Sequence, residues 1–224
     1  MIHFLLQADS TMVTVANPDS LNLIDLVMKG GIVLIPIAIL NIIGVYLLVE
    51  RYLTIKKANK LDPMFMNRIK DMVHDGNIKG AQSLCQTSDT PVARMLEKGL
   101  SRIGKPLKDI HVAVENVGRL EVYKLEKGMA LMATISGAAP MLGFLGTVTG
   151  MINTFHALSQ QAETIDAGLL SGGIYEAMVT TVAGLIVGIF AYISYNLLSA
   201  MIEKVIHKME ANTVEFLDIL HEPS

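Results

Sequence analysis

The sequence contains an uncharged stretch of 26 residues, from Ala177 to Ile202, and few folds can accommodate it. Crossing the hydrocarbon core of a bilayer takes about 20 consecutive apolar residues in a helix. Two further segments, 30–49 and 128–155, are also long and apolar enough. The composition agrees, because 51% of the 224 residues are hydrophobic, 17% are charged and the mean hydropathy is +0.46. We therefore predict an all-α integral membrane protein with three transmembrane helices.

The distribution of positive charge orients these spans, because Lys and Arg accumulate in the short cytoplasmic connections of membrane proteins. Fifteen of the 18 Lys and Arg residues lie between Arg51 and Lys127, and two more, Lys204 and Lys208, follow the third span. Only Lys29 precedes the first span. We therefore expect the N-terminus outside and the C-terminus in the cytoplasm.

The segments between the spans are long enough to form helices of their own. Pro63 and Pro91 suit first turns, while Gly76 and Gly104 suit helix ends. These signals predict helices from about Pro63 to His74, Ile78 to Thr87 and Pro91 to Ile103, and then one continuous helix from Leu107 into the second span. We expect two spans to extend into a cytoplasmic helical bundle. The predicted order is an outside segment with an interfacial amphipathic helix (1–29), first span (30–49), cytoplasmic helical domain (50–127), second span (128–155), outer connection (156–173), third span (174–202) and cytoplasmic C-terminal helix (203–224).

Small residues are concentrated in the second and third spans. Such residues let membrane helices approach one another closely. We expect them to form close helix contacts, and they are Pro140, Gly143, Gly146, Gly150, Gly184 and Gly188.

One carboxyl group and several hydroxyls accompany these small residues. Glu176 and Thr180 are four residues apart, Thr181 lies beside them, and Thr147 follows Gly143 by one helical turn. An ionisable residue at helix-centre depth costs roughly 3 kcal/mol, and such residues usually face a bundle interior or a water-filled path. A proton path through Glu176 is therefore one interpretation. Equally, Glu176 could cap the outer end of the third span, and the threonines could bond to their own helices.

The sequence gives no support to catalysis. It contains no phosphate-binding loop, no nucleophile with an adjacent base and no cluster of metal ligands, so we expect no enzyme activity, cofactor or metal site. The asymmetric charge indicates a membrane surface and not a nucleic-acid partner. Cys85 is the only cysteine, which excludes an intrachain disulfide, and a buried structural residue is the preferred interpretation.

Two runs of residues resemble a known family. They are Ala139-Pro140-Met141-Leu142-Gly143-Phe144-Leu145-Gly146-Thr147-Val148-Thr149-Gly150-Met151-Ile152 and Gly173-Ile174-Tyr175-Glu176-Ala177-Met178-Val179-Thr180-Thr181-Val182-Ala183-Gly184-Leu185. Together with Glu50-Arg51 after the first span and the long cytoplasmic insertion, they make nearly the whole chain similar to the MotA/TolQ/ExbB proton-channel family, and most similar to its ExbB branch.

This resemblance implies a function in the bacterial inner membrane. It implies a homo-oligomer, a pentamer, around the single span of an ExbD-like or TolR-like partner that supplies a membrane Asp. Proton passage would then energise a TonB-like or TolA-like protein across the periplasm. By matching position, Glu176, Thr147 and Thr181 would line the lumen and the proton path, with Thr180 adding a further hydroxyl. A TolQ-like role in envelope integrity and a non-conducting membrane scaffold are the alternatives.

Overall fold

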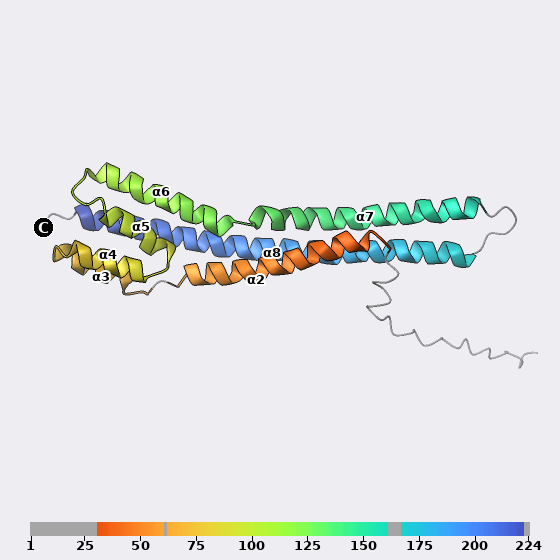
Figure 1. The fold of residues 1–224 in the computed structure, drawn as a ribbon, viewed down its shortest axis with the longest axis horizontal. Coiled ribbons are helices and arrows are strands. Elements are labelled where there is room, and N and C mark those ends of the chain that lie inside the picture. The colour runs from red at the N-terminus through yellow and green to blue at the C-terminus, as the bar shows by residue number, and fades with distance from the viewer. Residues whose placement is uncertain (1–30, 61, 161–166, 222–224) are drawn as a thin grey trace, which may run out of the picture.

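The computed structural model describes residues 31–60, 62–160 and 167–221, and these residues form seven helices and no strand (Figure 1). The predicted interfacial helix in residues 1–29 lies outside the described residues. The helices, in chain order, are α2 (Leu34–Ala58), α3 (Phe65–His74), α4 (Ile78–Thr87), α5 (Pro91–Leu100), α6 (Leu107–Glu126), α7 (Met129–Ser159) and α8 (Ala167–His221).

Three helical stretches of the described chain are long and apolar enough to cross a membrane, namely Leu34–Ala58, Leu107–Ser159 and Leu170–His221. The predicted all-α membrane protein with three spans is therefore confirmed. Figure 1 shows α7 and α8 side by side and antiparallel, with α2 lying along the middle of α8. The remaining helices gather at the far end of α8, close to the C-terminus.

The short helices lie where the sequence predicts, although α5 ends at Leu100 and not at the predicted Ile103. The Asn77 side chain accepts a hydrogen bond from the Gly80 N–H at 3.0 Å and caps α4, whose bounds Ile78–Thr87 match the prediction. Thr90 caps α5 by accepting from the Ala93 N–H, with Pro91 in the first turn. Helix α3 ends at His74 as predicted and starts two residues after Pro63.

The predicted continuous helix from Leu107 is wrong at one point. Helix α6 ends at Glu126 and α7 begins at Met129, because Lys127 is extended and Gly128 adopts a positive φ of 81°. Glycine reaches this left-handed conformation without the steric cost that a side chain imposes. The third span does continue as one helix, since α8 runs unbroken to His221.

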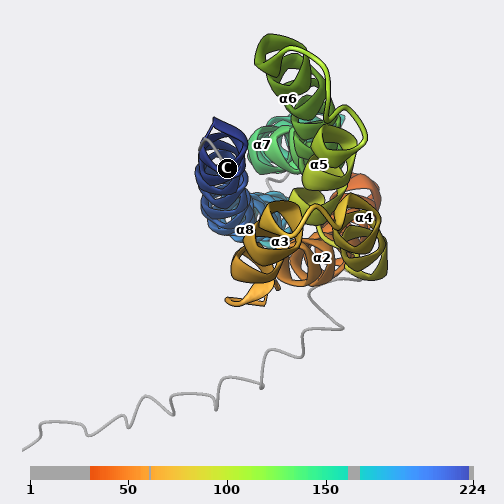
Figure 2. The same ribbon diagram turned by 90° about the vertical axis from the view of Figure 1, so that its left-hand side faces the viewer.

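We call α3–α6 with the C-terminal part of α8 the polar bundle. Figure 2 views it end-on, with α3, α4 and α5 gathered on one side of α8. Its core includes Ile69, Leu96 and Phe216, each fully buried. Cys85 is also buried, at 1% exposure, and burial together with the nearby Glu97 charge raises the pKa of its thiol to about 12.

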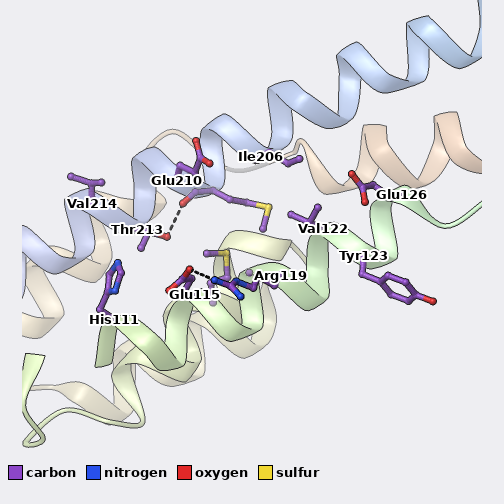
Figure 3. A pocket seen from close by; sticks show the side chains of 13 residues that line it. His111, Glu115, Arg119, Val122, Tyr123, Glu126, Ile206, Glu210, Thr213 and Val214 are labelled. Atoms are coloured by element: carbon purple, nitrogen blue, oxygen red, sulfur yellow. Dashed lines mark hydrogen bonds and ion pairs between the residues drawn. The ribbon is translucent and has the colours of Figure 1, made fainter. Parts of the chain in front are cut away.

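An open groove of about 520 Å³ separates α6 from α8 within the polar bundle (Figure 3). Apolar side chains line it from both helices, among them Val122 of α6 and Ile206 of α8. On the rim, Arg119 donates to Glu115 at 2.6 Å, and Thr213 bonds back to the Met209 carbonyl oxygen of its own helix at 2.8 Å. None of the predicted proton-path residues lines this groove.

Candidate functional site

The second and third spans meet at an interface lined by glycine, alanine and threonine, which we call the α7–α8 seam. A Cβ atom on Gly184 would lie 2.5 Å from the Ala139 carbonyl oxygen and 2.9 Å from the Gly143 Cα. Both neighbours are backbone atoms, so any side chain at this position would force the helices apart. The small residues therefore set the separation of the two helices.

The same close approach extends along the seam in both directions. A Cβ on Gly150 would lie 2.9 Å from the Ala177 Cβ, and one on Gly146 would lie 2.5 Å from the Thr180 hydroxyl oxygen. At the other end, a Cβ on Gly188 would collide with the ring of Pro140. All six small residues that the sequence analysis selected for helix packing thus lie at the α7–α8 seam.

Thr147 of α7 and Thr181 of α8 meet within the seam. Their hydroxyl groups form a short hydrogen bond across it. The Thr181 hydroxyl also lies 3.0 Å from the Gly143 carbonyl oxygen, and the Thr147 hydroxyl lies 3.2 Å from the Ala177 carbonyl oxygen. Since each hydroxyl has one proton and several acceptors, the pair can reverse the direction of its mutual bond, as a proton relay requires.

Thr180 occupies a different environment. It is 2% exposed, and its hydroxyl donates to the Ala177 carbonyl oxygen of its own helix at 2.7 Å. Thr154, near the C-terminal end of α7, is also buried and bonds to the Gly150 carbonyl oxygen at 2.8 Å. In the single chain these two hydroxyls satisfy helix carbonyl groups and fill the seam.

Glu176 lies beside the seam and not within it. Its side chain is exposed in the single chain, while the next residue, Ala177, is buried against Gly150. One carboxylate oxygen rests against Gly31, immediately before α2. The structure thus brings Thr147 and Thr181 together but leaves the Glu176 carboxylate on another side of α8, open to a neighbouring molecule.

The large side chains around the seam are mostly apolar and exposed. Phe144 and Ile152 on α7 and Met178 and Ile186 on α8 each expose about three fifths of their surface or more. Monomeric soluble proteins seldom expose so much contiguous apolar surface, which is typical of contact with lipid or with other membrane helices. The two spans therefore present a predominantly apolar surface to lipid or to neighbouring helices.

Charged side chains join the spans to the polar bundle. Arg51, at 6% exposure, donates to the Lys124 carbonyl oxygen at 3.1 Å and pairs with Glu50. Nearby, the buried carboxylate of Glu121 accepts from Arg94 at 2.6 Å and from Lys124 at 2.7 Å. Burial acts to raise the pKa of Glu121, but these two hydrogen bonds and charges outweigh it and hold that pKa below its ordinary value.

One contact of the site could not be predicted from the sequence. Gly31 lies more than 140 positions before Glu176, and only its place beside Gly30 at the start of a span marked it. Thr154, by contrast, shares one helix face with Gly143, Thr147 and Gly150 by its spacing, and it packs against Gly173 of α8. Spacing along one helix cannot reveal which partner helix approaches.

These features define the class of protein. The chain is a multi-pass helical membrane protein in which two closely packed spans carry hydroxyl groups and a carboxylate lies beside them. Residues 87–211, more than half of the chain, match the MotA/TolQ/ExbB proton channel family. The chain belongs to that family.

Individual relatives are similar over much of the chain. The putative biopolymer transport protein ExbB-like 3 of Synechocystis sp. is 29% identical over 78% of this chain and 83% of its own length. A putative biopolymer transport protein ExbB homolog of Methanothermobacter thermautotrophicus is 27% identical over 84% of this chain and 66% of its own. The Tol-Pal system protein TolQ of Pseudomonas aeruginosa is 31% identical over 59% of this chain and 62% of its own.

Proposed function

We propose that this chain is the proton-conducting stator subunit of an ExbB-like motor in the bacterial inner membrane. In this function, protons crossing the membrane through a complex of several copies energise a TonB-like protein and hence transport across the outer membrane. The observation that carries the proposal is the Glu176 carboxylate, which lies in a membrane-length helix and is exposed beside the Thr147–Thr181 pair.

The energetics agree with this function. Placing an ionisable group at membrane depth costs roughly 3 kcal/mol, so we expect such a residue to have a function. Moving one elementary charge through 100 mV releases about 2.3 kcal/mol, and a few protons therefore supply enough free energy for a mechanical step. Thr147 and Thr181 are proposed to relay protons near Glu176, and Thr180 to support the same path from the α8 side.

A path of this kind needs more than one chain. Within the part of the chain that the structure describes, the spans α2, α7 and α8 leave many large apolar side chains exposed, and these faces need lipid or protein neighbours. We propose a homo-oligomer, a pentamer, around the membrane span of an ExbD-like partner whose Asp exchanges protons with Glu176. The polar bundle then lies in the cytoplasm, in keeping with the 15 Lys and Arg residues between Arg51 and Lys127.

The test replaces Glu176 by Gln in the full chain, expressed with its partner in cells that lack the native copy. We expect loss of proton-driven uptake with normal co-purification of the partner. Glu215→Gln is the matched control, because Glu215 is an exposed carboxylate in the polar bundle of the same helix. If Glu176→Gln retains both assembly and uptake, the proton path is wrong and the non-conducting scaffold is favoured.

A TolQ-like role is the second candidate, favoured by the 31% identity to the Pseudomonas aeruginosa protein. The two systems differ in what they energise. Complementation of a strain that lacks TonB-linked uptake, compared with one that lacks Tol-Pal envelope integrity, separates them. We expect this chain to restore uptake, and restoration of detergent resistance alone would assign it to the Tol-Pal type.

A further inference from the structure

The Glu176 carboxylate lies against Gly31, a glycine outside both of the family-like motifs. A Cβ on Gly31 would overlap one carboxylate oxygen of Glu176 and lie 3.5 Å from its carboxyl carbon. Gly31 also has a φ of +62°, a left-handed backbone that side chains disfavour. Space and backbone conformation thus separately require glycine at this position.

This contact places the carboxylate at the start of the first span. The Leu34 N–H donates to the Gly31 carbonyl oxygen at 3.2 Å, so Gly31 opens the turn that leads into α2. The first N–H groups of a helix have no acceptor within it and form the positive end of its dipole. A carboxylate is favoured at such an end.

The side of α8 that carries the exposed Glu176 also carries two buried residues. Val179 and Val187 follow Glu176 by 3 and 11 residues, a spacing that keeps them on one side of a helix, and both are buried. Glu176 continues this side at the point where α2 begins. The first span therefore begins beside the carboxylate.

We propose that Gly31 is a positioning residue for Glu176: the absent side chain admits the carboxylate to the start of α2 and thereby fixes where it meets protons and the partner subunit. The inference rests on the proposed function of Glu176. It adds a role for the first span, because the N-terminal turn of that span sets the position of the Glu176 carboxylate on the third span.

A cross-linking experiment tests the contact without reference to function. Cysteines replace Gly31 and Glu176 together in a Cys85→Ala background, in the assembled complex in native membranes, and a short bifunctional thiol reagent is added. Met178→Cys with Gly31→Cys is the control, since Met178 points to another side of α8 and is 61% exposed. We expect at least five-fold more intrachain product for the 31/176 pair. Equal yields for the two pairs would overturn the contact.

Activity then tests positioning. Gly31→Ala should lower proton-driven uptake at least five-fold, whereas Gly76→Ala should leave it unchanged, because Gly76 has a similar φ of +72° but no atom within 4 Å of a Cβ. Glu176→Asp shortens the carboxylate by one methylene, so adding Gly31→Ala to that variant should cause less than a two-fold further loss.

The outcomes distinguish failure of the positioning role of Gly31 from failure of the proposed function of Glu176. Full activity of Gly31→Ala would refute positioning while leaving Glu176 in the proton path, provided that Glu176→Gln is inactive. A full five-fold loss on adding Gly31→Ala to Glu176→Asp would assign the defect to the backbone of α2 and would also refute positioning. Full activity of Glu176→Gln would instead remove the proposed function itself.

Discussion

Replacement of Gly184 by Ala tests the packing of the α7–α8 seam with one methyl group. The new Cβ would lie 2.5 Å from the Ala139 carbonyl oxygen, whereas ordinary van der Waals contact begins at 3.4 Å. Because the opposing atoms are backbone, the helices must separate locally by about 0.9 Å. Overpacking of this kind typically costs about 1–3 kcal/mol. A separation of that size would also stretch the 3.0 Å bond from Thr181 to the Gly143 carbonyl oxygen beyond hydrogen-bonding distance.

Thermal unfolding in detergent, followed by circular dichroism, measures this cost. A loss of about 2 kcal/mol corresponds to a decrease in Tm of roughly 4–8 °C for a chain of this size. Gly137→Ala is the matched control, because Gly137 lies on α7 and no atom is within 4 Å of its Cβ position. It should be neutral or slightly stabilising, since alanine favours helix. An unchanged Tm for Gly184→Ala would show that the close approach is not needed for stability.

Three further predictions concern other groups. Glu121→Gln should destabilise the chain at pH 7 by about 1–2 kcal/mol, because two hydrogen bonds to partly exposed cations weaken. Since the pKa of Glu121 is lowered in the folded chain, the difference in unfolding free energy between the native chain and the variant should shrink as pH falls below about 4.5. A difference unaffected by pH would contradict this prediction. Cys85, with a pKa of about 12, should resist iodoacetamide at pH 8 until denaturation, as mass spectrometry can report. Thr147→Val should lower proton-driven uptake several-fold with the partner still bound, whereas Thr134→Val, which removes only a bond to the Ala130 carbonyl oxygen, should not.

Much of the fold could be predicted because it depends on local signals. The length of the uncharged stretch after Glu176 set the third span, and caps such as Asn77 and Thr90 set the short helices. The break at Gly128 was missed because the apolar positions of α6 continue in register toward α7, and a single glycine is compatible with either a helix interior or a break.

The site was predictable in its components and less so in its geometry. Helical spacing grouped Glu176 with Thr180, but the structure buries Thr180 in the seam and turns Glu176 toward the start of α2. The meeting of Thr147 and Thr181 depends on how two antiparallel helices are registered. Register between helices distant in sequence is set by the close contacts of glycines such as Gly143 and Gly184, which no single-helix pattern specifies.

A proton-flux measurement in vesicles shows whether Glu176 carries protons across the membrane. The full chain and its single-span partner are reconstituted together in vesicles, a potassium diffusion potential is imposed, and an internal pH-sensitive dye reports proton entry. We predict flux with the native chain and with Glu215→Gln, and flux at the level of empty vesicles with Glu176→Gln, while the partner remains bound in all three. Equal flux through the native and Glu176→Gln complexes would contradict the account.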